Sequence, residues 1–402
     1  MAQDKGSKNL NVPPLRFPSF TDEWKKTTLG EITTNFNLRN KEQIEYPMFS
    51  VTNNRGFIPQ SEQFEDREMK GEDIKAYKVI HENDFAYNPA RINVGSIAKY
   101  NGKEPCMISS LYVCFKANPE IDEDWLMHLL HTPKIQYYYQ LNGEGGVRIY
   151  LFYPNFARIR TSVPTIEEQK KIANFLSFID KRIATQTKII DNLQSLIKGL
   201  NDSFHEHIQG EVISFDEIGS SYSGLSGKSG DDFGQGSPFI TYLNVYQNNI
   251  VNEQQIDLVN VGANEKQNTV SYGDLLFTLS SETPEETGIG CVYLGPSGKY
   301  YLNSFCFGIT INNSNKVHPP YLAYLVSSTK FRRFVYPLAQ GSTRFNLQKN
   351  DFTKKKFMLL PIERQKGIST ILDTLSQQLV AESKLVELYK KQKDYLLRTL
   401  FI

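Results

Sequence analysis

The chain has 402 residues, of which 40% are hydrophobic and 12% aromatic, and its formal net charge is +1. Single cores seldom grow past roughly 250 residues, so this length predicts two or three domains. The composition excludes an intrinsically disordered chain, and the near-zero charge excludes a strong non-specific attraction of the whole chain to nucleic acid.

The N-terminus and the cysteines indicate where the protein works. The first residues, MAQDKGSKNL, lack the apolar stretch of a signal peptide, and apolar runs such as LMHLL fall far short of the roughly 20 residues that cross a bilayer. We expect residues 1–20 to form the N-terminal arm of a cytoplasmic protein. The cysteines stand in strand-like stretches, which favours buried, reduced thiols over a metal or redox site. They are Cys106, Cys114, Cys291 and Cys306.

Residues 21–165 are predicted to form a first globular domain. Short strand-like segments alternate with Gly, Asn and Pro turns. One helix is predicted in DEDWLMHLLHTPKIQYYYQL, from Asp122 to Leu141. This mixture predicts an α+β domain.

Three predicted loops of this domain, VTNNRG, YNPARINVG and GGVRIY, carry side chains that suit contact with DNA. Amide and guanidinium groups hydrogen-bond base edges, and arginine also binds phosphate. A solvated turn with a surface arginine is the alternative interpretation of GGVRIY. The candidate DNA-binding residues are Asn53, Asn54, Arg55, Tyr87, Asn88, Arg91, Asn93, Arg148 and Tyr150.

Residues 166–210 are predicted to form one long helix. Thr165 and Glu168 fit a capping box at its start, and apolar residues then recur in alternating steps of four and three. This spacing is a heptad seam, in which Gln186 takes the one position without an apolar residue. The seam residues are Ile172, Leu176, Ile179, Ile183, Ile190, Leu193, Ile197 and Leu200.

Residues 211–361 are predicted to form a second α+β domain, with one helix in PPYLAYLVSSTKFRRFVYPLA. From Lys330 to Lys356 there are eight basic residues and one acidic residue, which suits contact with phosphates. The loops TYLNVYQNN, TLSSETPEETG and GSTRFN correspond to the candidate loops of the first domain. Their candidate DNA-binding residues are Asn244, Tyr246, Ser280, Ser281, Thr283, Arg344 and Asn346.

Residues 362–402 are predicted to form a second long helix with a more polar seam. Glu382 and Lys393 stand at seam positions, and the register near Lys393 is open. Two long seams in one chain favour an antiparallel coiled coil that spaces the two domains; the alternative is that each helix packs on its own domain. The apolar seam residues are Leu372, Leu375, Leu379, Val386 and Leu396.

The two halves of the chain are an internal repeat. When the chain is shifted by 196 residues, ten of the thirty-two positions from Gly145 to Leu176 are identical to their counterparts. Average composition gives about two identities. The repeat predicts two similar domains and two similar helices related by a pseudo-two-fold axis.

Signals for catalysis and metal binding are weak. YNPAR resembles the Asn-Pro-Pro-aromatic site of amino-methyltransferases but lacks the second proline and the aromatic residue that stacks on a flipped base. A strand followed by GxGxxG, which would bind a methyl donor, is missing, and the histidine pairs lack further ligands at matching spacing. We predict no catalytic, cofactor-binding or metal-binding residue.

Taken together, the chain resembles the specificity subunits of type I restriction-modification systems. The resemblance extends over nearly the whole chain, and its most specific element is the helix-opening phrase PTIEEQKKIA, repeated as PIERQKGI. It implies two target-recognition domains, here residues 21–165 and 211–361, that each read one half of a bipartite double-stranded DNA target. The two conserved helices would set the distance between the half-sites and dock two modification subunits.

The resemblance also implies that the chemistry belongs to partner proteins. The modification subunits would bring S-adenosylmethionine and methylate adenine at N6, and restriction subunits would use ATP and Mg for translocation and cleavage. The chain itself would be a non-catalytic subunit that binds no cofactor. Two alternatives stay open: a stand-alone DNA methyltransferase, which would bind the methyl donor, and a coiled-coil scaffold without DNA preference.

Overall fold

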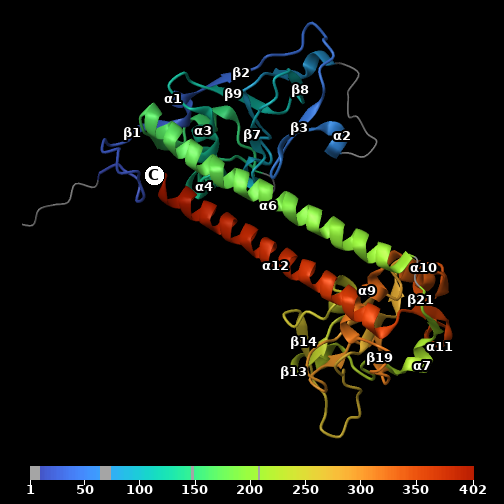
Figure 1. Ribbon diagram of the computed structural model, residues 1–402. Helices are drawn as coiled ribbons and strands as arrows, with labels where there is room; N and C mark the ends of the chain where they lie inside the picture. The colour runs from blue at the N-terminus through green and yellow to red at the C-terminus, as the bar shows by residue number, and fades with distance from the viewer. Residues whose placement is uncertain (1–9, 64–73, 146–148, 207–208) are drawn as a thin grey trace, which may run out of the picture. The chain divides into compact units, whose positions relative to one another are not determined.

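The structure is a computed structural model that describes residues 10–63, 74–145, 149–206 and 209–402 (Figure 1). The chain divides into two compact units: unit 1 comprises residues 1–187 and 384–402, and unit 2 comprises residues 188–383. In the described part of the chain, none of the helices combines the length and apolar character that a membrane crossing requires.

Unit 1 is built on a four-stranded antiparallel sheet in the order β2-β9-β6-β7, with two-stranded pairs β1-β10, β3-β4 and β5-β8 around it. Its strands are β1 (Lys25–Thr28), β2 (Thr33–Phe36), β3 (Phe49–Thr52), β4 (Gly56–Pro59), β5 (Lys78–Ile80), β6 (Phe85–Tyr87), β7 (Ile97–Lys99), β8 (Cys106–Ile108), β9 (Val113–Ala117) and β10 (Arg160–Val163). Its short helices are α1 (Leu29–Ile32), α2 (Gln60–Gln63), α3 (Glu123–Leu130), α4 (Pro133–Leu141) and α5 (Tyr153–Ala157), with 3-10 turns η1 (Ile74–Ala76) and η2 (Ile92–Val94).

Unit 2 repeats this plan with a four-stranded antiparallel sheet in the order β12-β19-β15-β17 and adds two three-stranded sheets, β14-β13-β18 and β16-β21-β20. Its strands are β11 (Glu211–Ile213), β12 (Gly219–Ser223), β13 (Phe233–Ile240), β14 (Ile256–Val259), β15 (Leu275–Thr278), β16 (Ser280–Ser281), β17 (Gly290–Val292), β18 (Tyr301–Leu302), β19 (Cys306–Ile311), β20 (Ala339–Gln340), β21 (Phe345–Leu347) and β22 (Phe357–Leu359). Its short helices are α7 (Phe215–Ile218), α8 (Tyr242–Gln247), α9 (Pro319–Ser327), α10 (Thr329–Val335) and α11 (Lys349–Lys354), with 3-10 turns η3 (Gly230–Asp232) and η4 (Tyr336–Leu338).

The internal repeat predicted from the sequence is therefore present in the fold. β2-β9-β6-β7 corresponds to β12-β19-β15-β17, and the pair β1-β10 corresponds to β11-β22. The helices α3, α4 and α5 likewise correspond to α9, α10 and α11. The predicted α+β class, with two similar domains and two long helices, is confirmed.

One prediction about the short helices is wrong. The single helix expected from Asp122 to Leu141 is two helices, because Thr132 caps α4 with its side chain and Pro133 takes the first position of α4. Proline lacks the N–H that would continue the helix before it. In unit 2, Ser328 caps α10 in the same way and separates it from α9.

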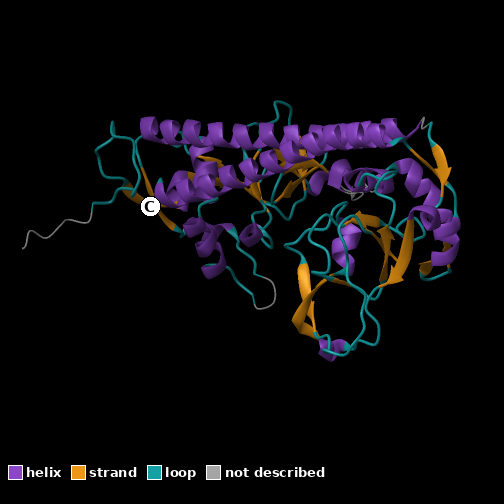
Figure 2. Cartoon of the chain, turned by 60° about the horizontal axis from the view of Figure 1, so that its bottom comes forward, coloured by secondary structure: helices purple, strands orange, loops and turns teal. Residues whose placement is uncertain are grey.

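The long helices are α6 (Ile166–Glu206) and α12 (Ile362–Thr399), both unbroken in Figure 2. At the start of α6, Thr165 Oγ1 accepts from the N–H of Glu168 over 3.4 Å. The reciprocal half of the predicted capping box is wrong, because the Glu168 carboxylate is buried in a bidentate pair with Arg16 at 2.7 Å. A charge-assisted fork is stronger than a bond to a backbone N–H.

Each unit contains one end of both long helices. In unit 1 the core includes Ile172, Leu176 and Ile179 from the start of α6 together with Leu396 and Leu400 from the end of α12. In unit 2 it includes Ile368 and Leu372 from the start of α12, with residues 197–204 of α6 packed against it. The two helices therefore run antiparallel, and each also packs on a globular domain. Both arrangements expected from the sequence, the antiparallel pair and the packing of each helix on a domain, are therefore present.

The seam positions of both helices face inwards. On α6 they are buried or half-buried: Ile172, Leu176, Ile179, Ile183, Gln186, Ile190, Leu193, Ile197 and Leu200. On α12 the same holds for Ile368, Leu372, Leu375, Leu379, Glu382, Val386, Tyr389, Lys393, Leu396 and Leu400. Lys393 keeps its place in the register because its Nζ lies 2.5 Å from a carboxylate oxygen of Asp180 on α6.

Candidate nucleic-acid interface

Unit 1 brings its candidate loops together at one end of its sheets. Asn53 to Arg55 form the turn of the β3-β4 hairpin, and a Cβ on Gly95, whose φ is 94°, would lie 3.5 Å from the carbonyl oxygen of Asn53. The loop after β6, which contains YNPAR, is joined to Leu151, the residue after GGVRIY, by a bond from the N–H of Leu151 to the carbonyl of Pro89 at 3.0 Å. Segments far apart in the sequence are thus neighbours in the fold.

The candidate residues of unit 1 differ in exposure. Asn53, Asn54, Arg55, Arg91 and Tyr150 are exposed, and Asn88 and Asn93 are half-buried. Arg55 pairs with Glu62 on α2, and Asn88 Oδ1 accepts from the N–H of Ala90 over 3.0 Å. Arg148 lies outside the described residues.

Tyr87 is a core residue rather than a surface one. Its ring is fully buried against Phe115 and Phe156, and burial raises the pKa of its hydroxyl far above the ordinary value. We therefore leave Tyr87 out of the surface that we consider for DNA.

Unit 2 holds the equivalent loops together in the same way. β16, which contains Ser280 and Ser281, pairs with β21 of the GSTRFN segment, and the N–H of Leu347 donates to the carbonyl of Leu279 at 2.8 Å. Leu347 is the repeat counterpart of Leu151. The β20-β21 turn begins at Gly341, where φ is 146° and a Cβ would meet the carbonyl oxygen of Arg344 at 2.0 Å, so glycine is required.

Exposed residues of this second surface include Thr283, Arg344 and Asn346. The guanidinium of Arg344 lies over the Phe305 ring, 5.8 Å from its centroid, and Phe305 is 55% exposed. Ser280 and Ser281 are buried, and Tyr246 is half-buried. The surface therefore combines an arginine with aromatic rings and hydroxyls.

Asn244 is placed inside unit 2. Its Nδ2 donates to the carbonyls of Asn252 and Gln255 at 2.8 and 3.1 Å, and its Oδ1 accepts from the N–H of Asn252 at 3.0 Å. A fully satisfied, buried amide positions a loop and does not reach a ligand. Asn244 therefore joins Tyr87 among the residues that we leave out of the DNA surface.

Sequence reasoning missed Glu286. Its carboxylate accepts hydrogen bonds from the hydroxyls of Tyr246 at 2.7 Å and Ser281 at 3.1 Å, beside the loop that carries Arg344. An acidic residue beside phosphates is unfavourable, and Tyr246 lies 40 residues away in the chain, so no sequence pattern marks this contact.

Part of the basic stretch of unit 2 serves the fold. Arg332 donates to the carbonyls of Glu285, Thr287 and Gly288, and burial lowers the pKa of its guanidinium to about 10. Lys356 pairs with Glu217 at 2.6 Å. Fewer than eight of the basic residues in 330–356 are therefore available to contact phosphate.

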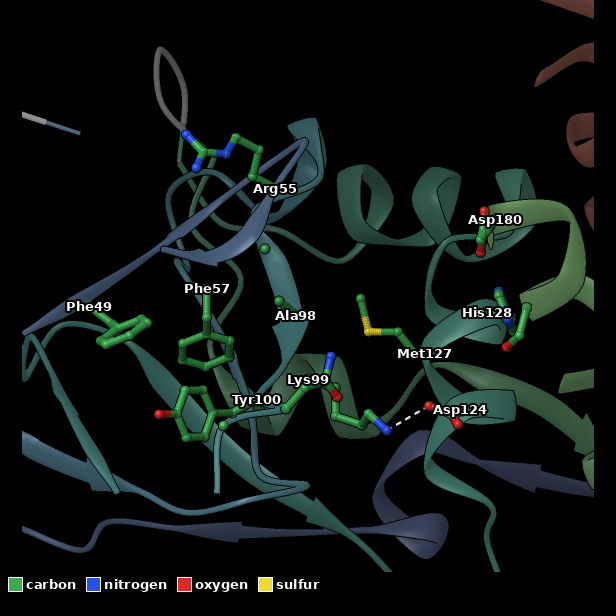
Figure 3. Close-up of a pocket in the computed structure, with 14 residues that line it drawn as sticks. Phe49, Arg55, Phe57, Ala98, Lys99, Tyr100, Asp124, Met127, His128 and Asp180 are labelled. Atoms are coloured by element: carbon green, nitrogen blue, oxygen red, sulfur yellow. Dashed lines mark hydrogen bonds and ion pairs between the residues drawn. The ribbon is translucent and has the colours of Figure 1, made fainter. Parts of the chain in front are cut away.

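Unit 1 also has a cavity of about 430 Å³ beside α6 (Figure 3). The aromatic rings of Phe49, Phe57 and Tyr100 line one side, whereas His128 and Asp180 lie on the other. Lys99 of β7 pairs across it with Asp124 of α3 at 2.5 Å. Burial, with the charge of Lys393, lowers the pKa of His128 to about 4, so this imidazole is neutral at pH 7.

A second cavity, of about 420 Å³, lies beside α12 in unit 2. Four of its lining residues are the repeat counterparts of residues that line the first cavity. The pairs are Met127 with Ala323, His128 with Tyr324, Ser177 with Asp373, and Asp180 with Ser376.

The cysteines are core residues. All four cysteines are buried and free, as predicted, and burial raises the pKa of Cys106 and Cys114 to about 12. Within the described residues, no group of three or more His, Cys, Asp and Glu side chains could hold a metal ion.

The fold is a duplicated α+β scaffold of two units joined by two long helices, and comparison with known families identifies its class. The family described as Type I restriction modification DNA specificity domain matches residues 21–195 and 226–388, one match for each half of the repeat. The chain belongs to this family. It is therefore a DNA-binding specificity subunit of a type I restriction-modification system rather than a stand-alone methyltransferase or a scaffold without DNA preference.

Relatives extend along almost the whole chain. A protein of Methanocaldococcus jannaschii assigned as the type I restriction enzyme MjaX specificity subunit is 24% identical over 93% of this chain and 92% of its own length. The type I restriction enzyme MjaVIII specificity subunit of the same organism is 22% identical over 79% of this chain and 76% of its own.

Solved structures share the fold. The S subunit of a type I restriction-modification system from M. genitalium superposes with a TM-score of 0.57 at 15% identity, covering 97% of this chain and 99% of its own. A chain from a study of complex assembly and conformational transition in the type I R-M system gives a TM-score of 0.60 at 14% identity, covering 96% and 98%.

Proposed function

We propose that each unit of this specificity subunit reads one half of a bipartite double-stranded DNA target, and that the long helices dock two modification subunits. The reading surface of unit 1 is formed by Asn53, Asn54, Arg55, Arg91, Asn93 and Tyr150, with Asn88 as a turn residue. That of unit 2 is formed by Tyr246, Thr283, Arg344 and Asn346, whereas the buried Ser280 and Ser281 lie beneath it and are left out. Arg148 belongs to the proposal through its counterpart, Arg344.

One observation carries the proposal. In both units, a backbone bond from a repeat-equivalent leucine, Leu151 or Leu347, joins the segment that follows the arginine motif to a second polar loop. The backbone bond is equivalent in the two units, but the polar side chains of the neighbouring loops differ between them. A shared frame with different donors and acceptors suits two domains that read different base sequences, because base identity is read by hydrogen bonds to base edges.

The long helices support the docking of partners. Large apolar side chains lie exposed on both, although the seam is already covered. They are Phe175, Phe178, Ile189 and Leu196 on α6 and Ile371, Val380, Leu388 and Tyr395 on α12. The equivalent cavities beside α6 in unit 1 and α12 in unit 2 support one partner of the same kind at each.

The partners would supply the chemistry. We propose that modification subunits carry S-adenosylmethionine and methylate adenine at N6, that restriction and translocase subunits carry ATP and Mg, and that this chain binds none of these cofactors. Its net charge of +1 fits this division, since the partners would then contribute much of the phosphate contact.

Single-molecule methylation sequencing tests the proposal. DNA from cells that express this chain with its modification partner is compared with DNA from cells that express the partner alone. The expected result is a new bipartite N6-methyladenine motif with an unread gap. Absence of any new motif, when gel filtration shows an assembled complex and the partner is competent with another specificity subunit, would contradict it.

A further inference from the structure

We infer that Glu286 is a specificity-determining residue of unit 2, whose carboxylate accepts a hydrogen bond from the 4-amino group of a cytosine in the half-site. The inference rests on the proposed DNA-reading function and deepens it. It assigns a base identity to a side chain.

Glu286 is held in place by hydroxyl donors. Tyr246 donates to Oε1 at 2.7 Å and Ser281 donates to Oε2 at 3.1 Å, and the Thr283 side chain also hydrogen-bonds the carboxylate. The ring of Tyr246 is itself stacked on Tyr242 with centroids 6.0 Å apart, and the hydroxyl of Tyr242 donates to the carbonyl of Ser280. The carboxylate is therefore oriented by side chains that are fixed to the sheet.

The surroundings of Glu286 belong to the proposed reading surface. Ser281 pairs in register with Phe345, the residue after Arg344. Glu286 and Arg344 both act electrostatically on Tyr242, so they lie on the same side of unit 2. In the part of the chain that the structure describes, no ion pair joins these two opposite charges, and Arg344 lies over the exposed ring of Phe305.

A carboxylate at this place is selective because it only accepts hydrogen bonds. About four lone-pair sites exist on an ionised carboxylate, and bonds from Tyr246, Ser281 and Thr283 leave one for a base donor. In the major groove, cytosine presents only an amino donor, guanine presents two acceptors, and thymine presents an acceptor and a methyl group. Adenine places its N7 acceptor beside its amino group, so cytosine is the one base edge without a repelling acceptor.

The charge of Glu286 also favours a role in base recognition over a purely structural role in holding the loop. A carboxylate near phosphates weakens non-specific attraction to DNA, whereas a glutamine would avoid that cost and still accept one of the two hydroxyl bonds through its carbonyl oxygen. The hydrogen bonds from Tyr246 and Ser281 lower the pKa of Glu286, so it is ionised at pH 7. An ionised acceptor is a stronger partner for an amino group than a neutral one.

The test is Glu286→Gln in the complete complex with its modification partner, followed by single-molecule methylation sequencing. Glutamine keeps the size and one accepting oxygen, and its NH2 group can donate to the other hydroxyl oxygen, but its amide can also pair with adenine. We expect one cytosine position in one half-site to become degenerate or to accept adenine, with the other half-site unchanged. The matched control is Glu282→Gln, which removes the same charge from an exposed position of the same loop and should leave the motif intact.

Binding measurements complete the test if the variant methylates too little DNA to define a motif. The assembled complex is titrated with four duplexes that differ only at that cytosine. Wild type should prefer cytosine by about 10-fold or more, and Glu286→Gln should reduce the preference to within about twofold. A preference for cytosine that persists in the variant, or an unchanged methylated motif, overturns the inference. A wild-type complex that assembles but produces no motif overturns the proposed function instead.

Discussion

Lys393 of α12 donates a hydrogen bond from Nζ to a carboxylate oxygen of Asp180 on α6 over 2.5 Å, within unit 1. Lys393 stands at a seam position where the heptad pattern expects an apolar residue. Its side chain is 29% exposed and that of Asp180 is 39% exposed. A lysine can cover apolar surface with its methylene stem while its charged end reaches an acceptor at the edge. The exception in the pattern is therefore an ion pair between the two helices.

This pair should contribute little to stability and more to register. We expect a double-mutant cycle of Lys393→Met and Asp180→Asn, measured by urea unfolding, to give a coupling free energy of about 0.5–1 kcal/mol, because both groups are partly hydrated. The coupling should shrink at high salt. A coupling of several kcal/mol that is insensitive to salt would contradict this description of the pair.

The repeated E-x-Q-K phrase, at residues 167–170 and 363–366, has an architectural role, visible in Gln169 and Gln365. Gln169 accepts from the N–H of Asp122 and donates to the carbonyls of Glu120 and Pro164. Gln365 makes the same three bonds with the counterparts, accepting from the N–H of His318 and donating to the carbonyls of Lys316 and Leu360. Each buried amide ties the start of a long helix to the segment that precedes α3 or α9.

We expect Gln365→Ala to lower the free energy of unfolding of unit 2 by about 2–4 kcal/mol. The substitution leaves a buried N–H and two buried carbonyls without their partner, at about 1–3 kcal/mol for a buried polar group left unsatisfied. Urea unfolding followed by tyrosine fluorescence measures the effect. Gln378→Ala, the same change at an exposed position of α12, should be neutral. Equal effects of the two variants would refute the role assigned to Gln365.

His205 should make unit 2 less stable in mild acid. It is buried at the end of α6, with Nδ1 2.7 Å from the carbonyl of Asn201 and Nε2 3.0 Å from the hydroxyl of Tyr321. Burial lowers the pKa of His205, against the effects of the Asn201 carbonyl and Asp202, while Lys330 adds to the lowering. The unfolded chain therefore takes up a proton at a higher pH than the folded one, about 6.5. The contribution is complete above that pH and is lost as the pH falls through the folded-state value.

The test is the melting temperature from pH 8 to pH 5 for wild type and for His205→Phe. Phenylalanine is the residue at the counterpart position, Phe401, which packs on Trp125 in unit 1. The wild type should lose more stability than the variant on acidification. His81→Phe, at an exposed position, serves as the control for general effects of losing a histidine. Parallel pH profiles for wild type and His205→Phe would show that another group carries the pH dependence.

Sequence periodicity was sufficient for the parts of the fold where one face of a long element is buried. The seam of α6 follows from steps of three and four residues, because every apolar position of a helix face points the same way. The same logic failed at Thr132 and Ser328, where a single capping side chain ends one helix and starts another. A single capping hydrogen bond of that kind leaves no periodic pattern in the sequence.

The sequence was sufficient to locate the loops, but it did not show which of their side chains are buried and which are exposed. Tyr87 and Asn244 have the chemistry of base-reading residues, yet one is packed among aromatic rings and the other bonds backbone groups of its own unit. Glu286 was missed because its donors come from distant segments. Burial in short strands and irregular loops depends on tertiary register, which one sequence does not encode in a readable pattern.

Val380 tests whether each long helix binds its own partner. It is 69% exposed on α12 and lines the unit 2 cavity. We expect Val380→Asp to leave the free subunit folded and to reduce the complex from two modification subunits to one, because a carboxylate buried without a partner is costly. Light scattering of the purified complex measures the stoichiometry. Ser383→Asp, an equally charged change at an exposed position of α12, should keep two partners, and two partners with Val380→Asp would place the contact elsewhere.

A substitution of Arg344 distinguishes base recognition from phosphate binding as the role of this residue in unit 2. Its guanidinium lies over the exposed Phe305 ring, 5.8 Å from the centroid, and an arginine held by its face can still offer in-plane N–H donors to guanine O6 and N7. We expect Arg344→Ala to relax the preference at one base pair of one half-site by about 1–3 kcal/mol, measured by competition binding of the assembled complex to single-substituted duplexes. Arg364→Ala, an exposed arginine at the start of α12, removes the same charge and should leave the preferences unchanged. Uniform weakening across all duplexes, with a shallower dependence on salt, would instead assign Arg344 to a phosphate.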